Sequence, residues 1–184
     1  MRILPLILSL MALPAFAAPE AYRLNEETSV VGFTYSFQGN ETQGRMPVQS
    51  AEMLLDLDNV PASKVNVTLD ASRAKAGFIF ATQTMKGPQV LNTADFPSIQ
   101  FRSTEITGDL SGATVRGNLT IRDVTRPVTL QAGLFRQSGT QIGDRSKLIV
   151  QLTGTISRSA YGAGGFPGFV DDTIALNIIA RIER

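Results

Sequence analysis

The chain has 184 residues, with 17 basic and 16 acidic side chains, no cysteine and no histidine. The missing side chains exclude disulfides, thiol chemistry, metal sites built on cysteine or histidine, and Ser-His-Asp or Cys-His catalysis. The balanced charge, with no basic stripe, argues against a nucleic-acid partner and against electrostatic docking onto an anionic membrane.

Residues 1–17 have the three parts of a secretory signal peptide. Arg2 supplies the positive start, Ile3 to Leu13 form an apolar run, and Ala15-Phe16-Ala17 gives the small-x-small cleavage pattern. The run is shorter than the ~20 residues that cross a bilayer. We therefore expect cleavage after Ala17, a bacterial periplasmic location, one mature domain over residues 18–184, and no stable membrane insertion.

Most of the remaining chain alternates apolar and polar residues with a period of two. This pattern is typical of half-buried antiparallel strands, and turn residues such as Gly39-Asn40 and Ser138-Gly139 separate the runs. The inward-facing sets are Val31, Phe33, Tyr35, Phe37; Met53, Leu55, Leu57; Val65, Val67, Leu69; Ile99, Phe101; Leu119, Ile121; Val128, Leu130, Ala132, Leu134; Leu148, Val150, Leu152; and Ile174, Leu176, Ile178, Ala180, Ile182. We predict an all-β fold of roughly eight to nine strands, as a barrel or a sandwich.

Two stretches break the alternation. Between residues 73 and 92, Phe78, Thr82 and Met85 recur at helical spacing, and Gly87-Pro88 ends the pattern. The predicted helix is either a lid over one barrel end or an ordinary core helix. Residues 161–169 combine four glycines with three aromatic residues, which is typical either of an exposed binding rim or of a loop buried by its own rings.

The sequence offers little for catalysis. Glu26-Glu27 and Asp171-Asp172 are the tightest carboxylate pairs, and adjacent residues of a strand point to opposite faces, so neither pair converges on one substrate. We expect no catalytic residue, no metal and no enzymatic activity. A barrel of about eight strands either is filled by its side chains or holds one small ligand, and alternation alone leaves both options open.

Three segments resemble a known family. Residues 117–130, GNLTIRDVTRPVTL, are similar to a strand–turn–strand motif of the YceI-like family, periplasmic lipocalin-like proteins described as polyisoprenoid-binding. Residues 96–101, FPSIQF, and 156–162, ISRSAYG, resemble two further motifs of that family. The resemblance covers the chain from Tyr22 to Ile182.

The chain also departs from the family pattern. Thr82 to Lys86 replace a run that contains an acid and a histidine in many members, which puts any headgroup contact of that run in doubt. Asp123 stands where glycine is usual, and aspartate tolerates the left-handed turn geometry that glycine prefers. Ala160 replaces an acidic residue.

The resemblance implies an extended antiparallel eight-stranded lipocalin-like barrel with one short helical segment near one end. It implies an interior that takes an isoprenoid lipid of the quinone or polyprenyl type, with no other cofactor, and a transient contact with a membrane cytochrome. Whether the protein is a monomer or a homodimer stays open. The competing hypothesis is a partner-binding stress-response protein whose barrel is packed and holds no lipid.

The lipid-binding hypothesis names twelve residues. Ten would line the interior through apolar or aromatic side chains, and Lys86 and Arg158 would make polar contacts at the mouth. The apolar and aromatic set is Phe33, Tyr35, Phe37, Phe78, Met85, Leu91, Phe101, Leu119, Ile121 and Tyr161.

Overall fold

The computed structural model describes residues 18–184, so the predicted signal peptide lies outside the described residues. Ten strands form one antiparallel sheet. They are β1 (Glu20–Leu24), β2 (Val30–Phe37), β3 (Asn40–Met46), β4 (Val48–Leu55), β5 (Lys64–Asp70), β6 (Ser98–Asp109), β7 (Gly112–Ile121), β8 (Val124–Arg136), β9 (Lys147–Ser157) and β10 (Thr173–Glu183).

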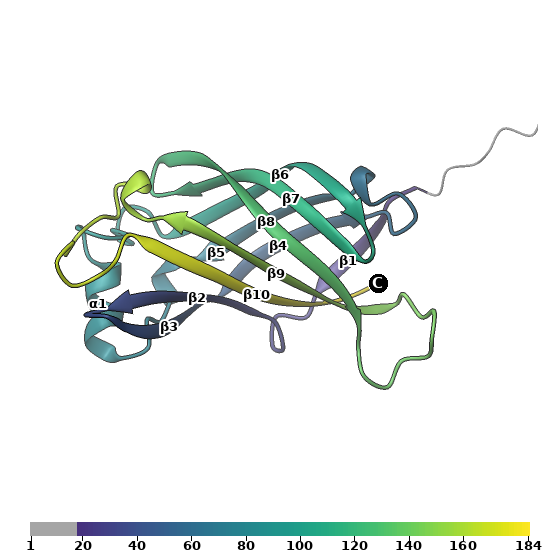
Figure 1. Ribbon diagram of the computed structural model, residues 1–184, viewed down its shortest axis with the longest axis horizontal. Coiled ribbons are helices and arrows are strands. Elements are labelled where there is room, and N and C mark those ends of the chain that lie inside the picture. Colours follow the sequence, from purple (N-terminus) through teal and green to yellow (C-terminus); the bar gives the residue numbers. More distant parts are fainter. Residues whose placement is uncertain (1–17) are drawn as a thin grey trace, which may run out of the picture.

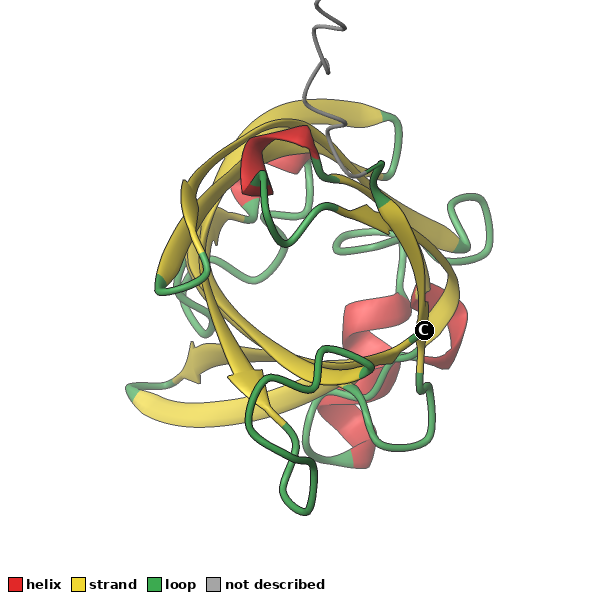
Figure 2. Cartoon of the chain, turned by 90° about the vertical axis from the view of Figure 1, so that its right-hand side faces the viewer, coloured by secondary structure: helices red, strands yellow, loops and turns green. Residues whose placement is uncertain are grey.

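Eight of these strands close into a ring. The order is β1-β4-β5-β6-β7-β8-β9-β10, and β1 pairs again with β10. Figure 1 shows the elongated barrel from the side, and Figure 2 shows the ring of strands from one end. The predicted eight-stranded antiparallel barrel is confirmed.

The β2–β3 hairpin extends one end of the barrel beyond this ring. β1 and β2 lie along the same edge of β10, where Leu24 pairs with Ile182 and Val30 with Ile179. β3 and β4 are separated only by Pro47, which has no N–H for a strand ladder. The outer edge of β3 meets no other strand of the described sheet, and its contact there is an isolated bridge from Arg45 to Lys75.

Residues 71–97 fill the gap beside this hairpin. The segment contains a 3-10 turn (Ala71–Arg73) and helix α1 (Ile79–Lys86), which begins after Phe78 and ends at Gly87. Helix α1 lies at the same end of the barrel as the tip of β2–β3 (Figure 1). The predicted short helical segment near one end is therefore present. Two further 3-10 turns, Val60–Ala62 and Ser159–Tyr161, lie in loops.

The turns follow ordinary backbone chemistry. Gln38 and Gly39 join β2 to β3 with φ of 50° and 81°, the geometry of a two-residue hairpin. In the β7–β8 turn, the residue with positive φ is Arg122, at 58°, and not Asp123. This two-residue connection places the left-handed conformation on its first residue, so the tolerance of aspartate for that geometry is not used at Asp123.

Candidate functional site: an apolar cavity inside the barrel

The barrel is hollow. A cavity of about 320 Å³ lies inside it, with lining residues that run from Arg158 and Ala163 at the helix end to Asp109 and Leu110 in the β6–β7 turn. This volume lies within the ~300–1,000 Å³ of typical ligand pockets. The lining side chains are apolar except for Ser29, Ser63, Asp109 and Arg158. An open interior is what lipid binding requires, and the packed barrel of the competing hypothesis is wrong.

Several inward-pointing strand residues are only half-buried because they border open space. Val67 on β5, Leu152 on β9 and Ile178 on β10 all line the cavity, yet none of them is fully buried. In a filled barrel, the same positions would be covered by opposite side chains. The sequence period of two thus selects the inward face, and the cavity leaves that face partly uncovered.

Two glycines keep large rings against the wall. Gly44 on β3 pairs with Phe33 on β2, and a Cβ at Gly44 would lie 2.1 Å from the Phe33 ring. A Cβ at Gly117 on β7 would lie 2.4 Å from the ring of Phe101 on β6. Each ring therefore occupies the space that a side chain on the neighbouring strand would take. This arrangement places aromatic surface on the cavity wall while leaving the centre open.

The polar side chains on the wall are already hydrogen-bonded within the chain. Ser29 Oγ accepts from the Arg181 N–H at 2.9 Å, and Ser63 Oγ accepts from the Asp56 N–H at 2.9 Å. Asp109 accepts from Ser111, which holds the pKa of the Asp109 carboxyl below its usual value. Among residues 18–184, no buried side-chain nitrogen or oxygen lacks a partner.

Arg158 is the most unusual of these groups, because its side chain is 7% exposed and bonded only to backbone carbonyls. Its Nε donates to Asp171 at 2.9 Å, its Nη1 donates to Ala163 and Gly165 at 2.7 Å, and its Nη2 donates to Val170 at 2.7 Å. Four of the five guanidinium N–H groups are thus used by one loop. Burial lowers the pKa of Arg158, and the Asp172 and Asp171 carboxylates partly offset that effect.

Residues 158–172 form the loop that Arg158 holds, here called the glycine loop. Ser157 and Ser159 both donate to the Asp172 carboxylate, which lowers the pKa of Asp172. The sequence predicted either an exposed rim or a loop buried by its own rings. The loop combines the two, since Tyr161 is buried while Phe166 and Phe169 are exposed. Among the described residues, no three carboxylates gather where they could hold a metal ion.

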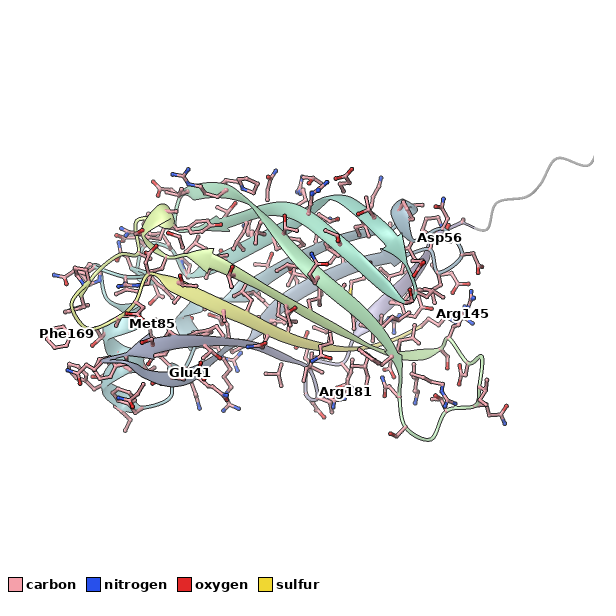
Figure 3. The ribbon with its side chains drawn as sticks, viewed as in Figure 1. Glu41, Asp56, Met85, Arg145, Phe169 and Arg181 are labelled. Carbon is pink, nitrogen blue, oxygen red and sulfur yellow. The ribbon has the colours of Figure 1, made fainter. Side chains whose placement is uncertain are left out.

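Seven of the twelve residues named from the sequence lie on the cavity wall. They are Phe33, Met85, Leu91, Phe101, Leu119, Ile121 and Arg158. Figure 3 shows Met85 at the helix end of the barrel. Arg158 lines the wall, but its guanidinium group is bonded to carbonyls of the loop and is not free at the mouth of the cavity.

The structure places the other five off the wall. The Tyr35 hydroxyl donates to the Ala76 carbonyl at 2.9 Å, and the Phe37 ring meets the Phe78 ring edge-on with centroids 5.7 Å apart. Tyr161 is buried in the apolar cluster that also contains Leu91 and Leu119, but it does not line the cavity. Lys86 ends helix α1 and does not reach the lining. Tyr35 and Phe37 share the inward face of Phe33, but that part of β2 faces residues 71–97 instead of the cavity.

The twelve named residues leave out most of the wall, although the inward-facing sets read from the sequence already contain much of it. The residues on β5, β8, β9 and β10 that alternate inward line the cavity together with those of β6 and β7. The same alternation identifies them, since each inward residue of a ring strand borders the interior. No helix among residues 18–184 is long and apolar enough to span a bilayer.

Comparison with known proteins agrees with this architecture. A UPF0312 protein of Enterobacter sp. strain 638 is 38% identical over 82 residues, which are 45% of this chain and 43% of the relative. A UPF0312 protein of Yersinia pestis strain Pestoides F matches with the same identity and coverage. The matched region thus spans less than half the length of these curated relatives.

Solved structures share the fold at lower identity. BcnA of Burkholderia cenocepacia superposes with a TM-score of 0.75 at 17% identity, covering 86% of this chain and 99% of BcnA. A polyisoprenoid-binding domain from Saccharophagus degradans, implicated in plant cell wall breakdown, has a TM-score of 0.62 at 14% identity, covering 89% and 98%. The YceI-like domain family matches residues 22–182. The hollow barrel and this match over nearly the whole described chain show that the protein belongs to the YceI-like domain family.

Proposed function

We propose that this protein binds an isoprenoid lipid of the quinone or polyprenyl type inside its barrel and carries it, without catalysis, in the bacterial periplasm. The observation that carries the proposal is the cavity of about 320 Å³ with an almost entirely apolar wall. The Saccharophagus degradans domain that shares this fold is described as polyisoprenoid-binding. The signal-like residues 1–17 support export.

The physical basis is burial of hydrocarbon. Each CH₂ group moved from water to an apolar site contributes ~0.8 kcal/mol. An isoprenoid tail has many such carbons and no polar atom, so it matches a wall whose few polar groups are already bonded within the chain. A polar headgroup finds no buried unpaired group inside the described residues, so we place it at an end of the cavity.

The direct test is to purify the protein from its native host, extract it with organic solvent and identify the extract by mass spectrometry. We expect a stoichiometric isoprenoid, and a higher melting temperature when delipidated protein is mixed with ubiquinone or with a polyprenol. Absence of any lipid, together with no thermal shift for either compound, would overturn the proposal. Periplasmic fractionation with N-terminal sequencing starting at Ala18 tests the location.

A matched pair of variants connects binding to the cavity. Ala132 on β8 lines the cavity, while its neighbour Gln131 is exposed. Ala132→Phe places a ring in the open interior, and Gln131→Phe places the same ring outside. We expect Ala132→Phe to lose the extractable lipid and the thermal shift, whereas Gln131→Phe retains both. Equal retention by the two variants would show that the lipid lies elsewhere.

A further inference from the structure

Large apolar side chains are exposed at one end of the barrel. Ile79 is 80% exposed and Phe80 is 69% exposed at the start of helix α1. Phe78 precedes them, and Phe166 and Phe169 in the glycine loop are also exposed. Helix α1 and the glycine loop lie at the same end in Figure 1, where Figure 3 labels Phe169. We call these five residues the apolar rim.

The tip of the β2–β3 hairpin joins the two halves of the apolar rim. The Phe37 ring meets the Phe78 ring edge-on at 5.7 Å between centroids, and Phe37 also pairs with Val170. The Gln38 N–H donates to the Phe169 carbonyl at 2.8 Å. The rim is therefore one connected surface held on a strand hairpin, and not scattered single residues, which need no explanation on a protein surface.

The shape of the rim suits a lipid surface better than a protein groove. Phe78, Ile79 and Phe80 are consecutive at the cap and first turn of α1, so they project around the helix tip. A helix that docks in a groove presents anchors at positions i, i+3 and i+7 on one side. Aromatic and aliphatic side chains that project together can instead enter the boundary between headgroups and acyl chains.

The local charge adds to this match. Residues 71–94 contain Arg73, Lys75 and Lys86 between the flanking Asp70 and Asp95, and Arg73 acts on the Asp70 carboxylate, which leaves Lys75 and Lys86 as the basic residues near the rim. None of these three basic residues is in an ion pair within the described chain. The even charge of the whole sequence argued against docking on an anionic membrane. The fold revises that expectation locally, because Lys75 and Lys86 lie outside the ion pairs of the described chain and belong to the segment that carries the exposed apolar side chains.

We infer that the apolar rim is a peripheral docking surface for a bilayer with anionic headgroups. Ile79, Phe80 and the two loop phenylalanines enter the interface, and Lys75 and Lys86 face the headgroups. The interaction is reversible and leaves the barrel outside the bilayer. This inference goes beyond lipid binding in the cavity and does not depend on what the cavity holds.

The test is flotation of the purified protein, expressed from the full chain, with vesicles that contain no isoprenoid. One vesicle set contains phosphatidylglycerol and phosphatidylethanolamine, and the other contains only phosphatidylcholine. We expect flotation with the first set, weaker flotation with the second, and weakening by salt because charge contributes. The double variant Ile79→Glu, Phe80→Glu should lower partitioning at least about tenfold, since two buried apolar side chains are lost.

Ile142 provides the matched control, because it is 94% exposed in the loop between β8 and β9, away from the rim. Ile142→Glu should float like the unmodified protein. Failure of the unmodified protein to float, or equal flotation by the double variant, would overturn the inference. So would a dimer that depends on Ile79 and Phe80 in the absence of flotation, which would assign the rim to a second copy. Lipid extraction from the double variant reports separately on the cavity.

Discussion

The two ends of the barrel are closed in different ways. At the helix end, residues 71–97 and the glycine loop are held by side chains that donate to backbone carbonyls, chiefly Arg158 and Tyr35. At the opposite end, Tyr22, Met53, Leu148 and Ile182 form a separate buried apolar cluster. Closure by directional hydrogen bonds depends on a few donor side chains, whereas closure by burial depends on the volume that apolar side chains fill. Single substitutions at the two ends should therefore fail for different reasons.

The largest effect is expected at the helix end. Arg158→Met keeps an apolar stem of similar length but leaves four loop carbonyls without their donor. We expect a loss of about 3–5 kcal/mol in the free energy of unfolding, measured by urea denaturation, because unsatisfied buried acceptors each cost about 1–3 kcal/mol. Arg158→Lys should recover little of it, since an ammonium cannot reproduce the guanidinium fork.

Arg126 is the control for this prediction. Its Nε donates to the Ala160 carbonyl at 3.1 Å from an exposed position. Arg126→Met should cost less than about 1 kcal/mol, because water can replace the donor. Equal losses for the two arginines would show that the carbonyl cage around Arg158 contributes nothing particular to stability.

A somewhat smaller effect is expected at the opposite end. Ile182 on β10 is fully buried, at 0% exposure, among Tyr22, Met53 and Leu148. Ile182→Ala should lower the free energy of unfolding by about 2–4 kcal/mol through lost burial and the void that remains. Ile142→Ala, the same chemical change at an exposed site, should be nearly neutral. A neutral Ile182→Ala would mean that this end collapses around the void.

The smallest effect compares two tyrosines that make the same bond at opposite ends. The Tyr35 hydroxyl donates to Ala76, and the Tyr22 hydroxyl donates to Arg145 at 2.8 Å. Each Tyr→Phe change should cost about 1 kcal/mol. Hydrogen exchange should then rise in residues 75–86 for Tyr35→Phe and in residues 137–146 for Tyr22→Phe. Faster exchange in the same segment for both variants would contradict independent closures.

The two tyrosines also predict a pH dependence. Burial raises the pKa of both Tyr22 and Tyr35 above the ordinary value of 10.0. A raised pKa means that the folded protein favours the neutral phenol, so this contribution to stability is complete below pH 10 and is lost as the pH rises above it. Denaturation at increasing pH should show the loss, and it should be smaller in the Tyr35→Phe, Tyr22→Phe double variant.

The sequence predicted the wall of the barrel better than its ends. Alternation identified the inward faces of β6 to β10, because each ring strand has one face toward the interior and one toward water. It missed β3, whose sequence NETQGRM has only one large apolar residue, the buried Met46 at its end. It also could not show that Tyr35 and Phe37 lie beyond the ring, since that depends on where β2 leaves β1 along the edge of β10.

The open interior was likewise outside the reach of sequence pattern. It depends on Gly44 and Gly117 lying against the rings of Phe33 and Phe101, contacts that exist only once the strand register is fixed. The role of Arg158 depends on four carbonyls from one folded loop, and backbone carbonyls leave no signature in side-chain order. The family motifs at residues 117–130 and 156–162 include Gly117 and Arg158. They do not explain why these two residues stand there.

Because the polar groups of the wall are already hydrogen-bonded within the chain, they affect how fast a bound lipid dissociates. A guest that meets only hydrocarbon is held by contact area, so its dissociation rate should fall by a constant factor with each added isoprene unit, at ~0.8 kcal/mol per buried CH₂. Once the lumen is full, further units extend into water and the rate stops falling. The chain length at that plateau would measure the usable length of the lumen, and changing the headgroup would hardly alter it.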